Sequence, residues 1–463
     1  MAAAVPRFEA WLPDSAVDAL SESLRDPAKV LGIRRAAFHS FLELPLEPNP
    51  LYRKYGYFAG VDLNGLDPAA VGGPVPLPPA ADGVLRIVHD SSGTRVELPP
   101  ELESAGIEVE TLPQIWKKGD AAAAEHLEGS DPSGDRLSAL AVALVNRGYR
   151  LRIPGKLRTP VRLQDVTVLS SPREALSVHR SIQVGGDSRL LASEEIYSTA
   201  PSDHQRLIAS SVNLKVGDGA QASYLTVHAP DSRAVGLVSR KAVTQRGARL
   251  GWVWGGFGGF RTRIRNFSTL EGPGSDIEDL QAFFGRGQQA YDSAVHMTHT
   301  GTDTHGQSVT RGVFQDDARG MSRGLVRIEK EARKTVSFLS EHAMLLSRGA
   351  RSDTIPILEI LCRDVKATHS SSVAPVDPEK VFYLESRGMT ESSAVRMISE
   401  GFLSHVLTRA PIANLRDLLY PLLAARWEGQ EVRWSAPSFP ALPRLEFASD
   451  VPETDWRFDA KLR

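Results

Sequence analysis

The middle of the chain, from about residue 151 to 376, consists of short runs of β-branched and aromatic residues separated by Gly, Asp and Ser turns. In the run SVNLKVGDGAQASYLTVHA, Val212, Leu214 and Val216 alternate with polar residues, which is the period of two of a half-buried β-strand. A chain with this pattern over about half of its length is predicted to fold into a mainly β structure with many short strands.

The same region carries a weak internal repeat. A turn-like element, Gly or an acid followed by Ala and then Arg or Gln, recurs with its Ala at positions 220, 248, 318, 332 and 350. The intervals are 28, 70, 14 and 18 residues, and the first three are multiples of 14. Strands and turns at a near-fixed period are typical of the stacked coils of a β-helix or related solenoid. On this pattern alone, a sandwich or a barrel is the alternative.

Helical patterns flank the β region on both sides. Residues 15–26, 30–44 and 136–146 have apolar side chains at helical spacing. After the β region, Asp377 can cap a helix that ends near Gly388. The sequence therefore predicts a mostly helical region with a linker at 1–150, a β core at 151–376, a helical domain at 377–430 and an extended tail at 431–463.

The composition argues against several classes of protein. Of the 463 residues, 41% are hydrophobic and 24% are charged, and the net charge of −2 gives no electrostatic case for binding nucleic acid or an anionic membrane. No apolar run approaches the roughly 20 residues that cross a bilayer, and the first residues do not resemble a signal peptide. The single cysteine fits a reducing cytoplasm and cannot supply the four thiolates of an ordinary iron–sulfur site.

Few motifs indicate chemistry carried by this chain alone. No G-x-x-x-x-G-K-[ST] motif occurs, so we expect no nucleotide bound at a P-loop. GGFGGF at 255–260 has Arg261 where a dinucleotide fingerprint needs its third glycine, and we interpret it as a strand with close backbone approach. His296, His299 and His305 look like a metal cluster, but His296 and His299 would face opposite sides of a regular strand. We expect solvated or hydrogen-bonded histidines there.

Acidic residues allow one enzymatic alternative. Carboxylates at 276–279 or 316–317 could bind Ca²⁺ or act as acid and base on a polysaccharide, as in some β-helical enzymes. That function requires several carboxylates to converge on one groove. Cys362 is interpreted as a buried, inert thiol. His369, in the stretch DVKATHSSSV, reads by itself as a structural histidine at the end of a strand.

The stretch at 356–402 resembles the C-terminal signature of the SufB/SufD family of iron–sulfur cluster assembly scaffolds. In that family, an LEI…DV…H strand segment leads to a helix with D-E-…-F-Y-L-x-S-R-G, and a second helix with A-x-x-…-F follows. Weaker similarity covers most of residues 140–407. The matching residues are Leu358, Glu359, Ile360, Asp364, Val365, His369, Asp377, Phe382, Tyr383, Leu384, Ser386, Arg387, Gly388, Ala394 and Phe402.

The resemblance implies a right-handed parallel β-helix flanked by N-terminal and C-terminal α-helical domains. It also implies a non-catalytic scaffold subunit that pairs with a SufB-like subunit and docks SufC, an ABC-type ATPase, on its C-terminal helices. Iron or an iron–sulfur cluster would be held transiently and shared with the partner subunit. The expected ATPase-docking residues are Phe382, Tyr383, Ser386, Arg387, Gly388 and Phe402.

Two positions make the chain resemble the SufD branch of the family. SufB carries a cluster-assembly cysteine where this chain has Glu341, and it flanks its histidine with glutamates where this chain has Thr368 and Ser370. His369 matches the SufD histidine implicated in cluster assembly, which makes it the candidate iron ligand at the interface. The usual C-S-H-G-A-T-V-G is here A-T-H-S-S-S-V-A, so the turn after His369 is expected to differ. Within the family, the alternative is a homodimer that stores or delivers iron without SufB.

Overall fold

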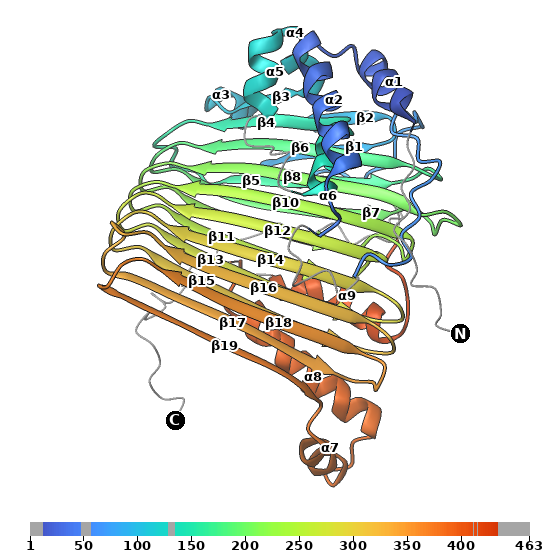
Figure 1. Cartoon of the computed structure of the whole chain (residues 1–463), viewed down its shortest axis with the longest axis vertical. Coiled ribbons are helices and arrows are strands. Elements are labelled where there is room, and N and C mark those ends of the chain that lie inside the picture. The colour runs from blue at the N-terminus through green and yellow to red at the C-terminus, as the bar shows by residue number, and fades with distance from the viewer. Residues whose placement is uncertain (1–12, 48–56, 128–134, 411, 414, 434–463) are drawn as a thin grey trace.

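The computed structural model describes residues 13–47, 57–127, 135–410, 412–413 and 415–433, and Figure 1 shows them as a stack of strands with helices at both ends. Most of the predicted tail, residues 434–463, lies outside the described residues. Within the described ranges the chain is a parallel β-solenoid, which confirms the mainly β prediction and rules out the sandwich and the barrel.

Two sheets face each other across the core of the solenoid. The ten-stranded sheet runs β19 (Val365–Pro375), β17 (Thr335–Leu345), β15 (His305–Phe314), β13 (Asp276–Gly285), β11 (Arg249–Gly256), β9 (Gln221–His228), β7 (Arg189–Ser198), β5 (Val161–Leu169), β1 (Val84–Asp90) and β2 (Gly93–Glu97). The nine-stranded sheet runs β18 (Arg351–Ile360), β16 (Arg319–Ile328), β14 (Ala290–His299), β12 (Arg261–Leu270), β10 (Ala234–Thr244), β8 (Arg206–Val216), β6 (Ala175–Val184), β4 (Arg147–Ile153) and β3 (Glu108–Thr111).

Each coil adds one strand to each sheet, because consecutive strands from β4 to β19 alternate between the two sheets. Val235 pairs with Arg261, 26 residues later, and Ala175 pairs with Leu207, 32 residues later. The coil therefore spans about two of the 14-residue intervals seen in the sequence. The repeated alanines occupy two rows of turns and are all buried: Ala220, Ala248 and Ala332 precede strands of the ten-stranded sheet, and Ala318 and Ala350 precede strands of the nine-stranded sheet.

The solenoid begins earlier in the chain than the predicted β core at 151–376. β1 pairs in parallel with β5 and forms a hairpin with β2, and β3 pairs with β4. The segment expected to be mostly helical thus contributes three strands to the sheets. All seven residues of β1 are buried, so this strand lacks the alternation of polar and apolar residues that marks a half-buried strand.

Helices cover the N-terminal end of the solenoid, as Figure 1 shows. They are α1 (Asp14–Leu24), α2 (Ala28–Glu43), α3 (Pro100–Ser104), α4 (Leu112–Lys117), α5 (Asp120–Leu127) and α6 (Arg136–Ala143). α6 starts where the Asp135 carboxylate accepts hydrogen bonds from the backbone N–H groups of Leu137 and Ser138. The apolar sides of α1, α2 and α6 form one buried cluster with residues of the nine-stranded sheet, from Ala175 on β6 to Ala290 on β14 and Met321 on β16.

Three helices follow the last strand: α7 (Pro378–Glu385), α8 (Glu391–Leu407) and α9 (Leu415–Trp427). Leu403 of α8 and Leu419 of α9 belong to a buried cluster with Val309 and Val313 of β15, so these two helices cover the outer face of the ten-stranded sheet. α7 projects beyond the last coil (Figure 1). Among the helices in the described ranges, none combines the length and apolar composition needed to span a bilayer.

The core between the sheets contains charged residues as well as apolar ones. Arg180 on β6 donates to the Asp165 carboxylate over 2.6 and 2.8 Å and lies 3.1 Å from a carboxylate oxygen of Glu194. All three side chains are buried. Side chains remain ionised in such a buried environment only when they are paired and hydrogen-bonded, as these three are.

Candidate functional site

The C-terminal end of the solenoid is open. β18 pairs with β16 and β19 pairs with β17, and the outer edges of both strands pair with nothing else in the described part of the chain. Ile360, Leu361 and Val373 are exposed at this end. An unpaired strand edge presents a row of backbone N–H and C=O groups that another strand can bind. Within the described residues, the end of the solenoid therefore presents two unpaired strand edges.

His369 lies on β19 at this open end and is exposed. It pairs in register with Leu339 of β17, whose side chain is buried in the core with Val326. Directly paired residues of parallel strands project from the same face, so His369 is on the core side of the last strand. Its exposure follows from the missing next coil, because no described strand covers it.

Glu341 lies on the same face of the neighbouring strand, β17, and pairs with Ser371. Its side chain is only 1% exposed and accepts a 2.6 Å hydrogen bond from the Ser322 hydroxyl. Burial raises the pKa of Glu341 to about 7, while hydrogen bonds from Ser322 and the Ile355 backbone act in the opposite direction. From strand spacing and rise, the Cα atoms of Glu341 and His369 are about 8 Å apart. The two candidates share one wall without touching.

His342, which the sequence did not single out, ties the last two strands together on the outer face. Its Nδ1 lies 2.6 Å from the Ser372 hydroxyl and its Nε2 lies 3.2 Å from the Ser370 hydroxyl. Burial lowers the pKa of His342 to about 4, and the charges of Arg311 and His405 act in the same direction. The imidazole is therefore neutral at pH 7. Only the coil period, which brings residues 342 and 372 side by side, could have revealed this contact.

α8 is attached to the sheet beside these strands. The guanidinium carbon of Arg311 on β15 lies 5.0 Å from the centre of the Phe402 ring, and the Ser399 hydroxyl lies 3.7 Å from the sulfur of Met344 on β17. Phe402, expected on a docking surface, is half-buried in this contact. A displacement of α8 would thus act directly on β15 and β17.

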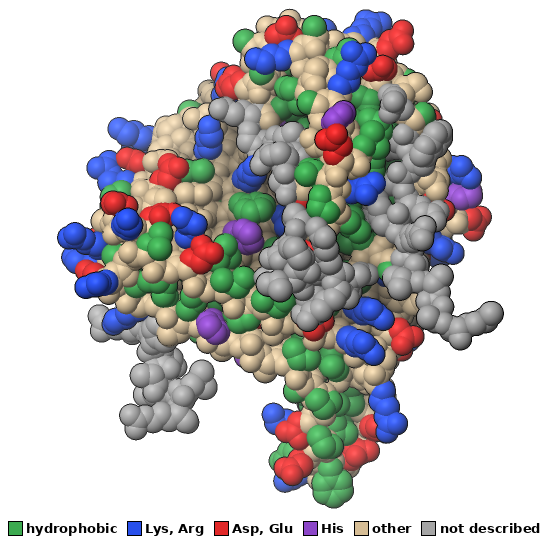
Figure 2. All heavy atoms as spheres, in the orientation of Figure 1, with side chains coloured by type: hydrophobic (Ala, Val, Ile, Leu, Met, Phe, Trp, Pro, Cys, Tyr) green, Lys and Arg blue, Asp and Glu red, His purple; other side chains and the backbone are tan. Residues whose placement is uncertain are grey.

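The exposed candidates lie on α7 and its end. Phe382 is 72% exposed and Tyr383 is 55% exposed. The Arg387 guanidinium lies 5.2 Å from the Tyr383 ring, and the Ser386 hydroxyl donates to the Tyr383 carbonyl oxygen. Gly388 ends this segment with a φ of +91°, a conformation that favours glycine. Figure 2 shows the projection at this end carrying hydrophobic and charged side chains together.

The acidic residues of the enzymatic alternative do not converge. Asp279 is buried in the core, where Gln281 donates to its carboxylate over 2.9 Å. Glu278, the preceding residue in the strand, faces outward and binds Arg409 at 3.0 Å. Asp316 lies in a turn and accepts from the Gly287 N–H. The shared groove that a polysaccharide-active enzyme requires is not formed by these carboxylates.

The histidine group at 296–305 is also dispersed. His299 is buried, with its ring nitrogens 2.9 Å from the Thr304 hydroxyl and 3.2 Å from the Ser337 hydroxyl, whereas His296 packs edge-on against Phe267. No group of three or more His, Cys, Asp or Glu residues in the described ranges could hold a metal ion. Cys362 is buried in an apolar cluster, in keeping with its interpretation as a structural thiol.

Comparison with known proteins identifies the family. The model of the SUF system FeS cluster assembly SufBD core domain matches residues 167–402, and SufD of Bacillus subtilis is 30% identical over 353 residues, covering 74% of this chain and 79% of that protein. The chain belongs to the SufB/SufD family. SufB of Bacillus subtilis is 24% identical over 318 residues, covering 67% of each chain. A SufBD family protein of Mycobacterium tuberculosis is 29% identical over 212 residues, 46% of this chain and 25% of that longer protein.

Proposed function

We propose that this SufB/SufD family protein is a SufD-like, non-catalytic scaffold subunit that pairs with a SufB-type subunit through β18 and β19. The observation that carries the proposal is the open end of the solenoid, with two unpaired strand edges and exposed apolar residues. A second solenoid of the same family has strands of matching length and spacing, so it can continue both sheets by backbone hydrogen bonding. The paired subunits would then enclose the core side of β19.

His369 would contribute to a cluster-assembly site at this junction. Its imidazole is exposed on the core side of the terminal strand, and no described side chain forms a hydrogen bond with it. A neutral imidazole is a suitable ligand for Fe²⁺. The only cysteine of the chain is buried, so the partner would supply the thiolates. Iron or an iron–sulfur cluster is thus a transient cargo of the pair.

The C-terminal helices would dock the SufC ATPase, and this chain would bind no nucleotide itself. Exposed aromatic side chains such as Phe382 and Tyr383 are the residue types that dominate binding energy at protein interfaces. α8 connects that surface to β15 and β17 through Phe402 and Ser399. Motion of the ATPase could therefore reach the strands that carry Glu341 and His369.

The test is an anaerobic reconstitution with the SufB-type and SufC-type proteins and the variant His369→Ala. We expect the complex to assemble with unchanged mass, because His369 is exposed and makes no described hydrogen bond, but to build no cluster. Thr368→Ala is the matched control, because Thr368 is exposed on the opposite face of the same strand and should leave cluster yield normal.

Normal cluster yield with His369→Ala would refute the role of this residue. The pairing has a separate readout, the mass of the wild-type chain with and without the SufB-type protein. A chain that stays a homodimer and ignores the SufB-type protein would refute the pairing and favour iron storage or delivery by a homodimer.

A further inference from the structure

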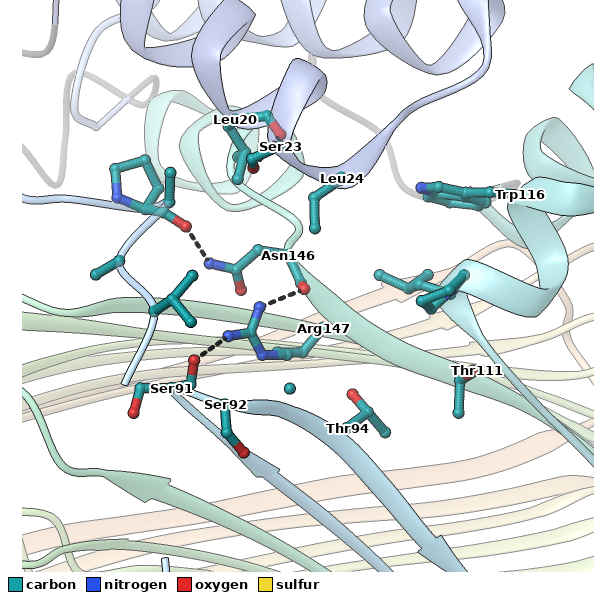
Figure 3. Close-up of a pocket in the computed structure, with 17 residues that line it drawn as sticks. Leu20, Ser23, Leu24, Ser91, Ser92, Thr94, Thr111, Trp116, Asn146 and Arg147 are labelled. Carbon is teal, nitrogen blue, oxygen red and sulfur yellow. Dashed lines mark hydrogen bonds between the residues drawn. The ribbon is translucent and has the colours of Figure 1, made fainter. Parts of the chain in front are cut away.

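A pocket of about 270 Å³ lies at the end of the solenoid opposite β18 and β19, between α1, the β1–β2 turn and α4 (Figure 3). Its wall combines serine and threonine hydroxyls with the apolar side chains of Leu24, Val71 and Trp116. Among the described residues that line it, Arg147 is the only charged one. The pocket thus joins a single cation to an apolar surface.

Arg147 is held by neutral partners. Its Nε donates to the Asp90 carbonyl oxygen over 2.9 Å, one terminal nitrogen donates to the Asn146 carbonyl over 2.8 Å, and the other donates to the Ser91 carbonyl over 3.0 Å. Figure 3 shows the guanidinium between Asn146 and Ser91, in the middle of the lining residues. A guanidinium has five N–H donors, so these three bonds leave two for a ligand.

The positive charge of Arg147 lacks a direct counter-ion. None of the ion pairs among the described residues includes it, and burial lowers its pKa, with the charges of Glu174 and Asp90 acting in the opposite direction. Among the contacts of the described residues, neither carboxylate pairs with the guanidinium: Asp90 binds Arg95 at 2.8 Å, and Oε2 of Glu174 accepts from the backbone N–H groups of residues 170 and 171. A bound anion would supply the missing negative charge.

The walls of the pocket are fixed before any ligand binds. The Trp116 indole N–H donates to the Asp26 carboxylate over 2.8 Å, which sets the orientation of the ring. The Asn146 side-chain amide donates to the carbonyl oxygens of Pro68 and Ala175 over 2.8 and 2.7 Å. A preorganised site loses little conformational entropy on binding, which favours affinity for small ligands.

We propose that this pocket binds a small organic monocarboxylate with a flat apolar body. The carboxylate would accept the two remaining N–H donors of Arg147, and the body would lie against Trp116 and Leu24. One guanidinium matches the single charge of a carboxylate. At about 30 Å³ per water molecule the cavity has the volume of about nine waters, enough for a body of one or two fused rings. This inference is independent of the cluster site at the other end.

The test uses 2-naphthoate as the probe and 2-naphthamide as its uncharged counterpart, in ligand-observed NMR titrations of the full chain. We expect the carboxylate to bind at least about tenfold more tightly than the amide, because only the carboxylate supplies a counter-charge. Val71 allows a control on intact structure, because its side chain lines the pocket yet is 84% exposed.

Relative to the uncharged variant Val71→Asn, Val71→Asp should weaken 2-naphthoate binding by about two- to fivefold and Val71→Lys should strengthen it by a similar factor. Binding of the amide should be the same in all three variants. Arg147→Met, checked for folding by circular dichroism, should abolish the preference for the carboxylate. Equal binding of acid and amide, no response to the charge at residue 71, or no binding of 2-naphthoate would each overturn the proposal.

Discussion

Replacing Glu341 by glutamine should stabilise the isolated chain at alkaline pH and leave it unchanged at acidic pH. The folded-state pKa of about 7 lies above the ordinary value of 4.5, so folding favours the protonated carboxyl. Below about pH 4.5 both states hold the proton and the shift contributes nothing. As the pH rises to 7 the unfolded chain ionises first, and stability falls. Above about pH 7 the folded chain carries the full free-energy cost of ionising the buried Glu341 carboxyl.

The size of this penalty follows from the two pKa values. Each pH unit between 4.5 and about 7 corresponds to about 1.4 kcal/mol, so ionised Glu341 costs the fold about 3 kcal/mol at alkaline pH. Glutamine keeps the size of the side chain and can accept the hydrogen bond from Ser322, but it carries no charge. Glu341→Gln should therefore gain about 3 kcal/mol over the wild type at alkaline pH and less than about 1 kcal/mol near pH 5.

Urea unfolding of wild type and variant at about pH 5 and about pH 8.5 measures this difference directly. The pH-dependent contributions of the other buried acids, Glu195, Asp276 and Asp279, are the same in both proteins and drop out of the stability difference. Glu359→Gln on β18 is the matched control, because its side chain is exposed. A stability difference that is the same at both pH values, or a variant less stable than wild type at alkaline pH, would refute the reasoning.

Two further substitutions test the docking surface and the charged core. Replacing both Phe382 and Tyr383 by serine should weaken binding of the SufC-type ATPase at least about tenfold in calorimetry. The melting temperature should not fall, because both rings are exposed. Unchanged affinity would contradict the docking role. Arg180→Met leaves Asp165 and Glu194 buried without their main cation and should cost about 3–5 kcal/mol in urea unfolding, and a loss below about 1 kcal/mol would show that the network is not ionised.

The solenoid was predictable because its turns leave a mark in the sequence. The repeated alanines are buried in the turns where one coil stacks on the next. The close backbone approach predicted for GGFGGF is confirmed at Gly258, where an added Cβ would collide with the carbonyl oxygen of Pro230. The strand predicted there ends at Gly256, so residues 257–260 lie outside it. The cap predicted at Asp377 was equally local, because its carboxylate accepts a hydrogen bond from the Glu379 N–H in the first turn of α7.

Features of strands that are covered on both faces of the sheet could not be predicted from the sequence. β17 carries polar and apolar residues on both faces, with Leu339 and Glu341 in the core and His342 and Met344 on the outer face, so no alternation reveals which face is which. The burial of Glu341 and the contacts of His342 follow only from the register of strands about 30 residues apart. The same reason hid β1, which is buried along its whole length.

The open end of the solenoid makes the stability of its last coil conditional. In a stacked repeat each coil is held mainly by its two neighbours, and β18 and β19 have a neighbour on one side only. This coil is therefore expected to open first in the free chain, and the proposed partner would restrain it by mass action. Slow hydrogen exchange at β19 would then show that a partner is bound at this end. A protease that attacks frayed ends would remove unpaired subunits before assembled ones.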